Sequence, residues 1–136
     1  MAINQDKEVL VVDDSEDNLL LMDLLLTSEG YKVNSANSGT KGLAKVYQSN
    51  PDLIILDLMM PDMCGLEVVH RLKQEDNLPN IPILLLTANS HLRPIDIKDV
   101  NAVCYKPFDV NSILQQIKSL LTVDQDSTIA ALQSFA

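Results

Sequence analysis

Five polar residues come directly after four short apolar runs of this 136-residue sequence. Asp13 and Asp14 follow the first of these runs, Asp57 the second, Thr87 the third and Lys106 the fourth. Carboxylates, a hydroxyl and an amine are the groups that bind a divalent cation and handle phosphoryl groups. The set therefore predicts phosphoryl chemistry, provided that the fold brings the five side chains together.

The chain alternates short apolar runs with amphipathic stretches of helical composition. The predicted strands are residues 9–12, 31–36, 53–56, 82–86 and 102–105. The predicted helices follow them at residues 15–29, 39–48, 65–75, 94–100 and 109–121. Ser15 is the expected N-cap of the first helix, and Gly30 lies just past its end. This pattern predicts an α/β fold: a doubly wound, five-stranded parallel sheet, (βα)5, with helices on both faces.

The carboxyl ends of the strands are where such a sheet binds ligands, at the point where the strand order reverses. By analogy with flavodoxin-like folds, whose order is 2-1-3-4-5, the first and third strands are neighbours, so Asp13, Asp14 and Asp57 meet. Their mutual repulsion requires positive charge, which Lys106 and Mg²⁺ would supply. Asp57 is the candidate nucleophile, because a carboxylate can attack phosphorus and form an acyl phosphate.

Composition excludes several classes of function. Ten basic and nineteen acidic residues give a net charge of −9, which argues against direct binding to nucleic acid or to an anionic membrane. The apolar runs are far shorter than the roughly 18 residues of a membrane helix, and the N-terminus lacks the features of a signal peptide. Cys64 and Cys104 have no C-x-x-C spacing and are expected to be reduced, in a cytoplasmic protein.

The motifs at these positions resemble the response regulator receiver domain of two-component signalling. The resemblance is carried by VVDD at 11–14, DLMMPDMCG at 57–65, LTA at 86–88 and KPF at 106–108. It covers residues 6–122 and leaves residues 123–136 as a C-terminal tail. Because no output domain follows, we expect a stand-alone receiver.

The resemblance implies a phosphorylatable switch rather than an enzyme acting on other substrates. Asp57 would accept a phosphoryl group from a phosphohistidine on a histidine kinase or a phosphotransfer protein. Lys106 would pair with the phosphoryl oxygens, and Thr87 would hydrogen-bond one of them and couple modification to movement. The domain would catalyse only its own phosphorylation and dephosphorylation, and phosphorylation would change binding to a downstream protein that the sequence does not identify.

The resemblance also implies a Mg²⁺ site. Asp14 and Asp57 would ligate the cation directly, together with the main-chain carbonyl of Met59. Asp13 would act through an intervening water molecule.

Two departures from the family pattern fall in the part of the domain that usually signals. Receivers usually carry an aromatic residue three positions before the lysine, where this chain has Val103. The sequence leaves open whether Tyr105 takes the place of that aromatic residue. The segment between Thr87 and Lys106 is short and contains Pro94, so the helix at 94–100 is expected to have at most about two turns. We therefore expect signalling that does not use the common dimer across this face.

Three alternatives stay open on the residues alone. A receiver fold with impaired switching would be a constitutive protein-interaction module. An enzyme with an aspartate nucleophile, such as a small-molecule phosphatase, typically has a second acid two residues later, where this chain has Met59. A flavodoxin-like cofactor binder needs a hydroxyl- and glycine-rich phosphate loop after the first strand, where this chain has the segment 13–17, in which four of five residues are acidic.

Two further segments are candidates for contact with partners. The first helix is apolar on all sides, through Leu19, Leu20, Leu21, Met22, Leu24, Leu25 and Leu26. We expect Leu21 and Leu25 to face the sheet and Leu19, Leu20 and Leu24 to form an exposed patch for a phosphodonor or for self-association. In the tail, Ile129, Leu132 and Phe135 recur at helical spacing, which is consistent with an extra helix, an extended last helix or a frayed end.

Overall fold

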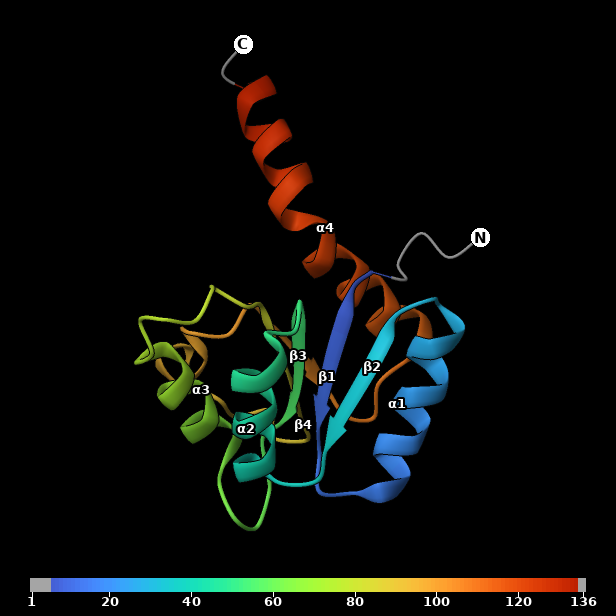
Figure 1. Cartoon of the computed structure of the whole chain (residues 1–136), viewed down its shortest axis with the longest axis vertical. Helices are drawn as coiled ribbons and strands as arrows, with labels where there is room; N and C mark the ends of the chain where they lie inside the picture. The colour runs from blue at the N-terminus through green and yellow to red at the C-terminus, as the bar shows by residue number, and fades with distance from the viewer. Residues whose placement is uncertain (1–5, 135–136) are drawn as a thin grey trace.

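The predicted alternation of strands and helices is present along the chain (Figure 1). The computed structural model describes residues 6–134, and the side chains of residues 6–122. The strands are β1 (Glu8–Val12), β2 (Lys32–Ala36), β3 (Leu53–Asp57), β4 (Ile83–Thr87) and β5 (Ala102–Tyr105). The helices are α1 (Glu16–Ser28), α2 (Gly39–Ser49), α3 (Gly65–Lys73) and α4 (Val110–Ser134), with a 3₁₀ helix, η1 (Pro94–Ile97), between β4 and β5.

The sheet is parallel, and its strand order, β2-β1-β3-β4-β5, confirms the predicted arrangement. The ends of β1 and β3 lie side by side, because Val12, the last residue of β1, pairs with Leu56, the residue before the end of β3. Asp57 is in turn level with Leu86 of β4, and Thr87 is level with Tyr105 of β5. The carboxyl ends of these four strands therefore form one continuous edge.

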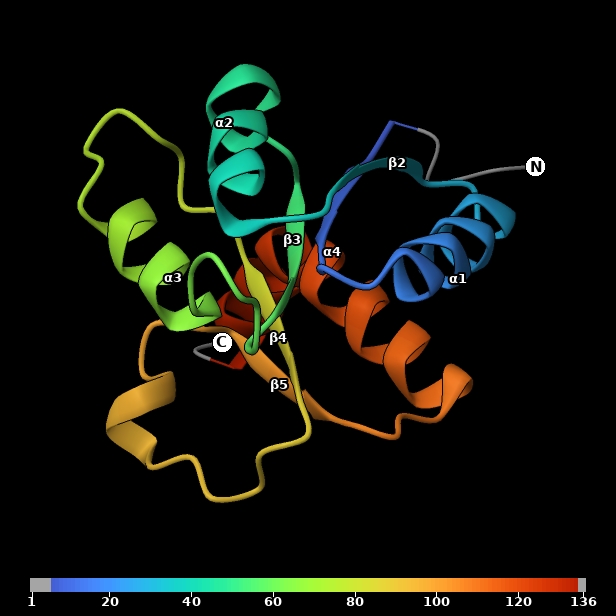
Figure 2. The ribbon, with the colours of Figure 1, turned by 90° about the horizontal axis from the view of Figure 1, so that it is seen from below.

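Two apolar layers lie on opposite faces of the sheet, because successive residues of a strand point to opposite sides. Leu10 and Ile54 belong to the layer covered by α2 and α3. Val9 and Ile55 belong to the layer covered by α1 and α4. Figure 2 shows the two helix pairs on either side of the sheet.

The buried face of α1 differs from the prediction. Three residues at helical spacing are buried: Leu19, Met22 and Leu26. Leu21 was expected to face the sheet but is 43% exposed, whereas Leu19 was expected in the exposed patch and is buried. Leu20 and Leu24 are exposed as predicted, at 59% and 62%. The exposed apolar surface of α1 thus consists of Leu20, Leu21 and Leu24, called the α1 patch below.

The outer edge of β2 is partly closed by side chains. The Lys32 N–H and the Ala36 carbonyl form hydrogen bonds with residues next to or in β1. Because the main-chain groups of successive strand residues point to alternate sides, the N–H and carbonyl of Ser35 point away from β1. The Ser35 N–H donates to Asn34 Oδ1 at 3.0 Å, and the Ser35 carbonyl accepts a hydrogen bond from the Lys45 ammonium. The same ammonium donates to Asn34 Oδ1 at 3.0 Å, which joins α2 to the strand edge.

The segment between β4 and β5 is reduced further than expected. Only Pro94–Ile97 is helical, in a single 3₁₀ segment. Arg93 and Asp96 close this short turn, because the Arg93 N–H and its guanidinium both donate to the Asp96 carboxylate. The shortened fourth helix is thus confirmed, with a smaller extent than the predicted 94–100.

The last helix is longer than predicted. It was expected to end near residue 121, but α4 continues to Ser134, and Figure 1 shows its final turns running past the edge of the sheet. Of the three forms considered for the tail, the backbone adopts an extended last helix. The side chains of Ile129 and Leu132, and the whole of Phe135, lie outside the described residues. Among the described helices, none combines the length and hydropathy needed to cross a membrane.

Candidate functional site

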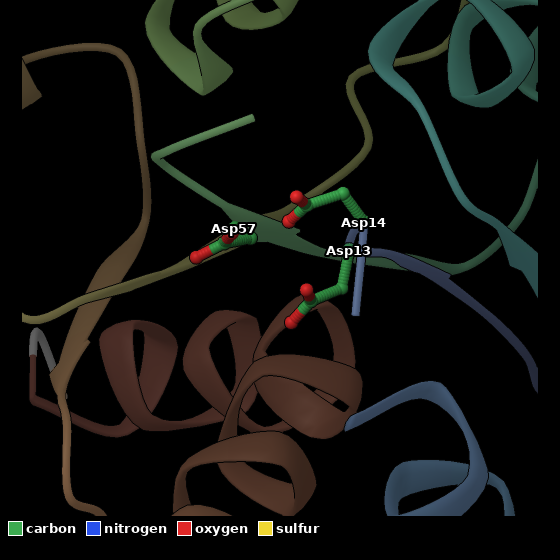
Figure 3. A group of neighbouring side chains, drawn as sticks. All are labelled: Asp13, Asp14 and Asp57. Atoms are coloured by element: carbon green, nitrogen blue, oxygen red, sulfur yellow. The ribbon is translucent and has the colours of Figure 1, made fainter. Parts of the chain in front are cut away.

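Asp13, Asp14 and Asp57 lie together at the carboxyl edge of the sheet. Figure 3 shows the first two side chains at the end of β1 and the third at the end of β3. One oxygen of each carboxylate lies within 4.8 Å of the others. Asp13 and Asp57 are buried, with 2% and 5% exposure, whereas Asp14 is exposed. The sequence prediction that these three acids meet agrees with this geometry.

Lys106 provides positive charge beside the acids. Its ammonium donates to Asp57 Oδ1 at 3.0 Å and lies 4.0 Å from Asp13 Oδ2. The Lys106 N–H donates to the Thr87 carbonyl at 2.8 Å, which continues the pairing of β4 and β5 by one residue and fixes where the side chain starts. The peptide bond to Pro107 is cis.

Asp13 is held in place by the first turn of α1. Its Oδ1 accepts the Ser15 N–H at 2.9 Å, and its Oδ2 accepts the Asn18 side-chain amide at 3.1 Å. Asn18 also donates its main-chain N–H to Ser15 Oγ at 3.2 Å, which confirms Ser15 as the N-cap. The role of Asn18 was not predicted from the sequence. Its position three residues after the cap was the available signal, since that side chain lies close to the residues preceding the helix.

Thr87 ends β4 and is buried, with 1% exposure. Its hydroxyl accepts the N–H of Asn89 at 2.9 Å, so it is engaged with the loop that leaves the strand. Tyr105, its register partner, is 45% exposed, while Val103 packs against the layer beneath α2 and α3. Thr87 and Tyr105 therefore stand at adjacent points of the sheet edge, one buried and one open to solvent.

The loop from β3 to α3 is closed tightly at its base. Gly65 N–H donates to the Leu58 carbonyl at 2.8 Å, and Leu58 N–H donates to the Leu86 carbonyl at 2.9 Å. A Cβ atom at Gly65 would lie 2.6 Å from the Asp57 carbonyl oxygen, so only glycine allows this approach. The intervening residues begin with Met59, whose side chain is 68% exposed.

Burial raises the pKa of Asp57 above its ordinary value, because desolvation disfavours the charged carboxylate. The hydrogen bond from Lys106 acts in the opposite direction, and repulsion from Asp13 and Asp14 raises this pKa further. The folded protein therefore holds a proton on Asp57 to higher pH than the unfolded chain does. Its contribution lowers the free energy of unfolding as the pH rises through the interval between the two pKa values, and this loss is complete above the folded-state value.

Replacement of Asp57 by asparagine is thus expected to stabilise the metal-free protein. At neutral pH in EDTA, Asp57→Asn should raise Tm, because the neutral amide resembles the protonated acid. The gain should disappear below the ordinary aspartate pKa, where both states of the wild type are protonated. Calorimetry across this pH range measures both effects.

The exposed Asp76 supplies the control for loss of one negative charge. Asp76→Asn should leave Tm close to the wild-type value at every pH. Saturating Mg²⁺ should reverse the order of wild type and Asp57→Asn, since a ligand that binds only the folded state stabilises it. A lower Tm for Asp57→Asn in EDTA at neutral pH would contradict this account.

The donor set fits Mg²⁺. This cation prefers oxygen ligands and is commonly held by one or two carboxylates, and here three carboxylates from two adjacent strands supply oxygens within 4.8 Å of one another. Two of the acids are buried beside a single described lysine, which leaves excess negative charge for a cation to balance. The site therefore has the chemistry of a magnesium centre.

Sequence comparison relates the chain to regulators of transcription. The probable transcriptional regulatory protein TcrX of Mycobacterium tuberculosis is 34% identical over 124 residues, which cover 88% of this chain and 52% of that protein. The DNA-binding dual master transcriptional regulator RpaA of Synechocystis is 39% identical over 116 residues, covering 83% of this chain and 48% of that protein. The chain thus spans about half the length of these relatives.

Structural comparison gives the same relationship. The response regulator TrrA of Thermotoga maritima, solved in complex with Mg²⁺ and BeF, is 34% identical with a TM-score of 0.77, covering 85% of this chain and 99% of the other. A CheY-like receiver domain from Methanospirillum hungatei is 27% identical with a TM-score of 0.82, covering 89% and 98%. The family model of the response regulator receiver domain matches residues 9–118. This chain therefore belongs to the response regulator receiver domain family.

Proposed function

We propose that the chain is a phosphoryl-accepting switch of a two-component or phosphorelay system, with Asp57 as the acceptor. The carboxylate would attack the phosphorus of a phosphohistidine, so that a P–O bond forms, the P–N bond breaks and the histidine nitrogen leaves. The observation that carries the proposal is the buried Asp57 carboxylate, 3.0 Å from the Lys106 ammonium and grouped with two further acids.

The proposed roles of the surrounding residues are those that the resemblance to receiver domains implies. Asp14, Asp57 and the main-chain carbonyl of Met59 would hold Mg²⁺, with Asp13 contributing through water, and the bound cation would supply charge stabilisation for the phosphoryl oxygens. That the Thermotoga maritima regulator was solved with Mg²⁺ and BeF supports this choice of cation. Asp13 is held by the start of α1, so its carboxylate is already oriented before a cation arrives.

Lys106 and Thr87 would respond to the arriving phosphoryl group. Lys106 would neutralise charge on its oxygens from the side of β5. Thr87 would exchange the Asn89 N–H, which its hydroxyl now accepts, for a phosphoryl oxygen, and so would move the loop after β4. The domain would catalyse only its own phosphorylation and dephosphorylation.

A second candidate is a constitutive protein-interaction module of receiver fold with impaired switching. Two observations favour it: Val103 packs into an apolar layer where receivers usually have a mobile aromatic ring, and η1 has only the four residues Pro94–Ile97. Tyr105 is exposed and level with Thr87, so it would be the residue that restores coupling in the switch. The two candidates share the acidic site and differ in whether phosphorylation changes partner binding.

Mass spectrometry after incubation with acetyl phosphate and Mg²⁺ tests phosphoryl acceptance. We expect a gain of about 80 Da per chain, one phosphoryl group, that is lost in Asp57→Asn and in EDTA. A gain retained in Asp57→Asn would sink the assignment of the acceptor. If the chain gains the phosphoryl group but a pull-down captures the same partner proteins before and after phosphorylation, the constitutive module is favoured.

The proposed partners are a histidine kinase or phosphotransfer protein as donor and a downstream protein as receiver of the signal. The α1 patch, Leu20, Leu21 and Leu24, is proposed as a contact surface for the donor or for a second copy, and the extended α4 as another route to self-association. Native mass spectra from the same experiment report the oligomeric state. The net charge of −9 argues against direct contact with nucleic acid, and the two free cysteines support a cytoplasmic setting.

A further inference from the structure

Asp62, at the tip of the β3–α3 loop, contacts the start of α2. Its Oδ1 accepts the Gly39 N–H at 3.1 Å, and its Oδ2 accepts the N–H and hydroxyl of Thr40 at 3.1 and 3.0 Å. The next N–H of the helix, that of Lys41, is satisfied from the helix's own N-cap, because Ser38 Oγ accepts it at 3.1 Å. The first turn of α2 is thus capped by two side chains, only one of which belongs to its own loop.

The hydrogen bonds of Asp62 with Gly39 and Thr40, called the clasp below, fix the tip of a loop that is already closed at its base. The base is set by the bonds of Leu58 with Leu86 and Gly65, and the tip is set by Asp62. The tip packs closely against α2, since a Cβ at Gly39 would lie 2.9 Å from Met63 Cβ. Met59 lies between these two anchored points.

Helix α2 is a rigid support for the tip. Leu43 and Val46 bury its inner face in the core, at 7% and 1% exposure. The Lys45 ammonium also ties α2 to the edge of β2. A loop bound to this helix has little freedom to move its main chain.

We propose that Asp62 is a positioning residue that holds the Met59 carbonyl where the Mg²⁺ site requires it. This inference rests on the proposed function, because Met59 is a ligand only in that proposal. The Thr40 and Gly39 N–H groups hold the pKa of Asp62 below its usual range, so the clasp stays ionised at neutral pH. Asp62 acts by holding the β3–α3 loop, and with it Met59, in a fixed position when no cation is bound.

The test compares Asp62→Ala with Ser38→Ala. Each variant removes one side-chain cap from the same turn of α2, so both should lose stability to a similar degree in urea unfolding. Only Asp62→Ala releases the tip of the β3–α3 loop from α2. Isothermal titration of the full chain with MgCl₂ should therefore give a Kd that is roughly tenfold weaker or more in Asp62→Ala and unchanged in Ser38→Ala, as expected for groups that orient metal ligands.

Phosphorylation by acetyl phosphate supplies a second readout. In Asp62→Ala the Mg²⁺ concentration for half-maximal rate should rise by the same factor as Kd, while the rate at saturating Mg²⁺ returns close to that of wild type. Asp62→Asn keeps one accepting oxygen and should give an intermediate Kd. It also keeps the experiment decisive if Asp62→Ala does not fold.

Each outcome has a distinct meaning. If wild type, Ser38→Ala and both Asp62 variants bind Mg²⁺ equally, the inference is overturned and the proposed function stands. If Ser38→Ala weakens binding as much as Asp62→Ala, loss of the helix cap alone explains the effect, and the positioning role is again wrong. If the wild type binds no Mg²⁺, the proposed function fails and this inference fails with it.

Discussion

Replacing Lys106 by methionine is expected to slow phosphoryl acceptance by Asp57 about a hundredfold while leaving Mg²⁺ binding intact. The ammonium lies 3.0 Å from the proposed acceptor oxygen, so it would lie beside the phosphoryl oxygens and stabilise their negative charge during transfer. Loss of one preorganised donor from such a site typically costs 10²–10³ in rate. Methionine keeps much of the length of the side chain, so the change is chiefly the loss of charge.

Mg²⁺ affinity separates this account from a general loss of structure. Lys106 repels a cation bound among Asp13, Asp14 and Asp57, so its removal should leave Kd for Mg²⁺ unchanged or lower it. Lys98→Met makes the same chemical change at an exposed position beside η1 and should affect neither property. Acetyl phosphate kinetics and calorimetric titration measure the two quantities. Transfer at the wild-type rate in Lys106→Met would show that the ammonium has no part in the reaction.

Replacing Gly65 by alanine should both destabilise the fold and misplace the acceptor. A Cβ there lies 2.6 Å from the Asp57 carbonyl oxygen and 3.0 Å from Leu58 Cα, and both are backbone atoms that cannot rotate away. The end of β3 or the start of α3 must therefore shift. Overpacking of this kind costs about 1–3 kcal/mol of free energy of unfolding. A displaced acceptor should slow phosphoryl transfer at least about tenfold, measured at a temperature where the variant is folded.

Gly30→Ala is the matched control for stability. Gly30 has φ of 92°, a conformation that costs an alanine about 1–2 kcal/mol, and it lies between α1 and β2 at the opposite end of the sheet. This variant should unfold at a similarly reduced denaturant concentration but accept phosphoryl groups at the wild-type rate. Equal rates in the two variants would mean that Gly65 matters for packing only.

The parts of the fold that could be predicted are those fixed by local pattern. Buried strands such as Leu53–Asp57 are apolar on both faces, and each ends at a polar residue or directly before one, so their type and carboxyl ends are visible in the sequence. Helix α1 shows where this breaks down. It is apolar on every side, and the pattern therefore does not determine which leucines meet the sheet, so Leu21 was assigned to the wrong face. The packing of α1 against β1 and β2 determines which of these leucines are buried.

The candidate site likewise contains residues that could be predicted from the sequence and residues that could not. Asp13, Asp57 and Lys106 could be found because strand order alone brings the ends of their strands together. The contact of Asn18 with Asp13 is local to the start of α1, whereas the contact of Asp62 depends on how a loop and the start of another helix meet in three dimensions. Asp62 and Gly39 are separated by 23 residues, and no local pattern links them. The charged residues of the site were therefore predictable, whereas a residue such as Asp62, which supports the site through a contact distant in sequence, was not.

The bonds at Ser35 limit how this protein can join other chains. An edge strand with unpaired backbone groups invites addition of another strand, which leads to sheet extension or aggregation. At Ser35 both outward groups already have partners, Asn34 and the Lys45 ammonium. An incoming strand would have to displace a lysine that α2 holds across the edge. Association of this receiver is thereby directed away from strand addition at this position and toward its helical surfaces, where contacts form and separate without rebuilding the sheet.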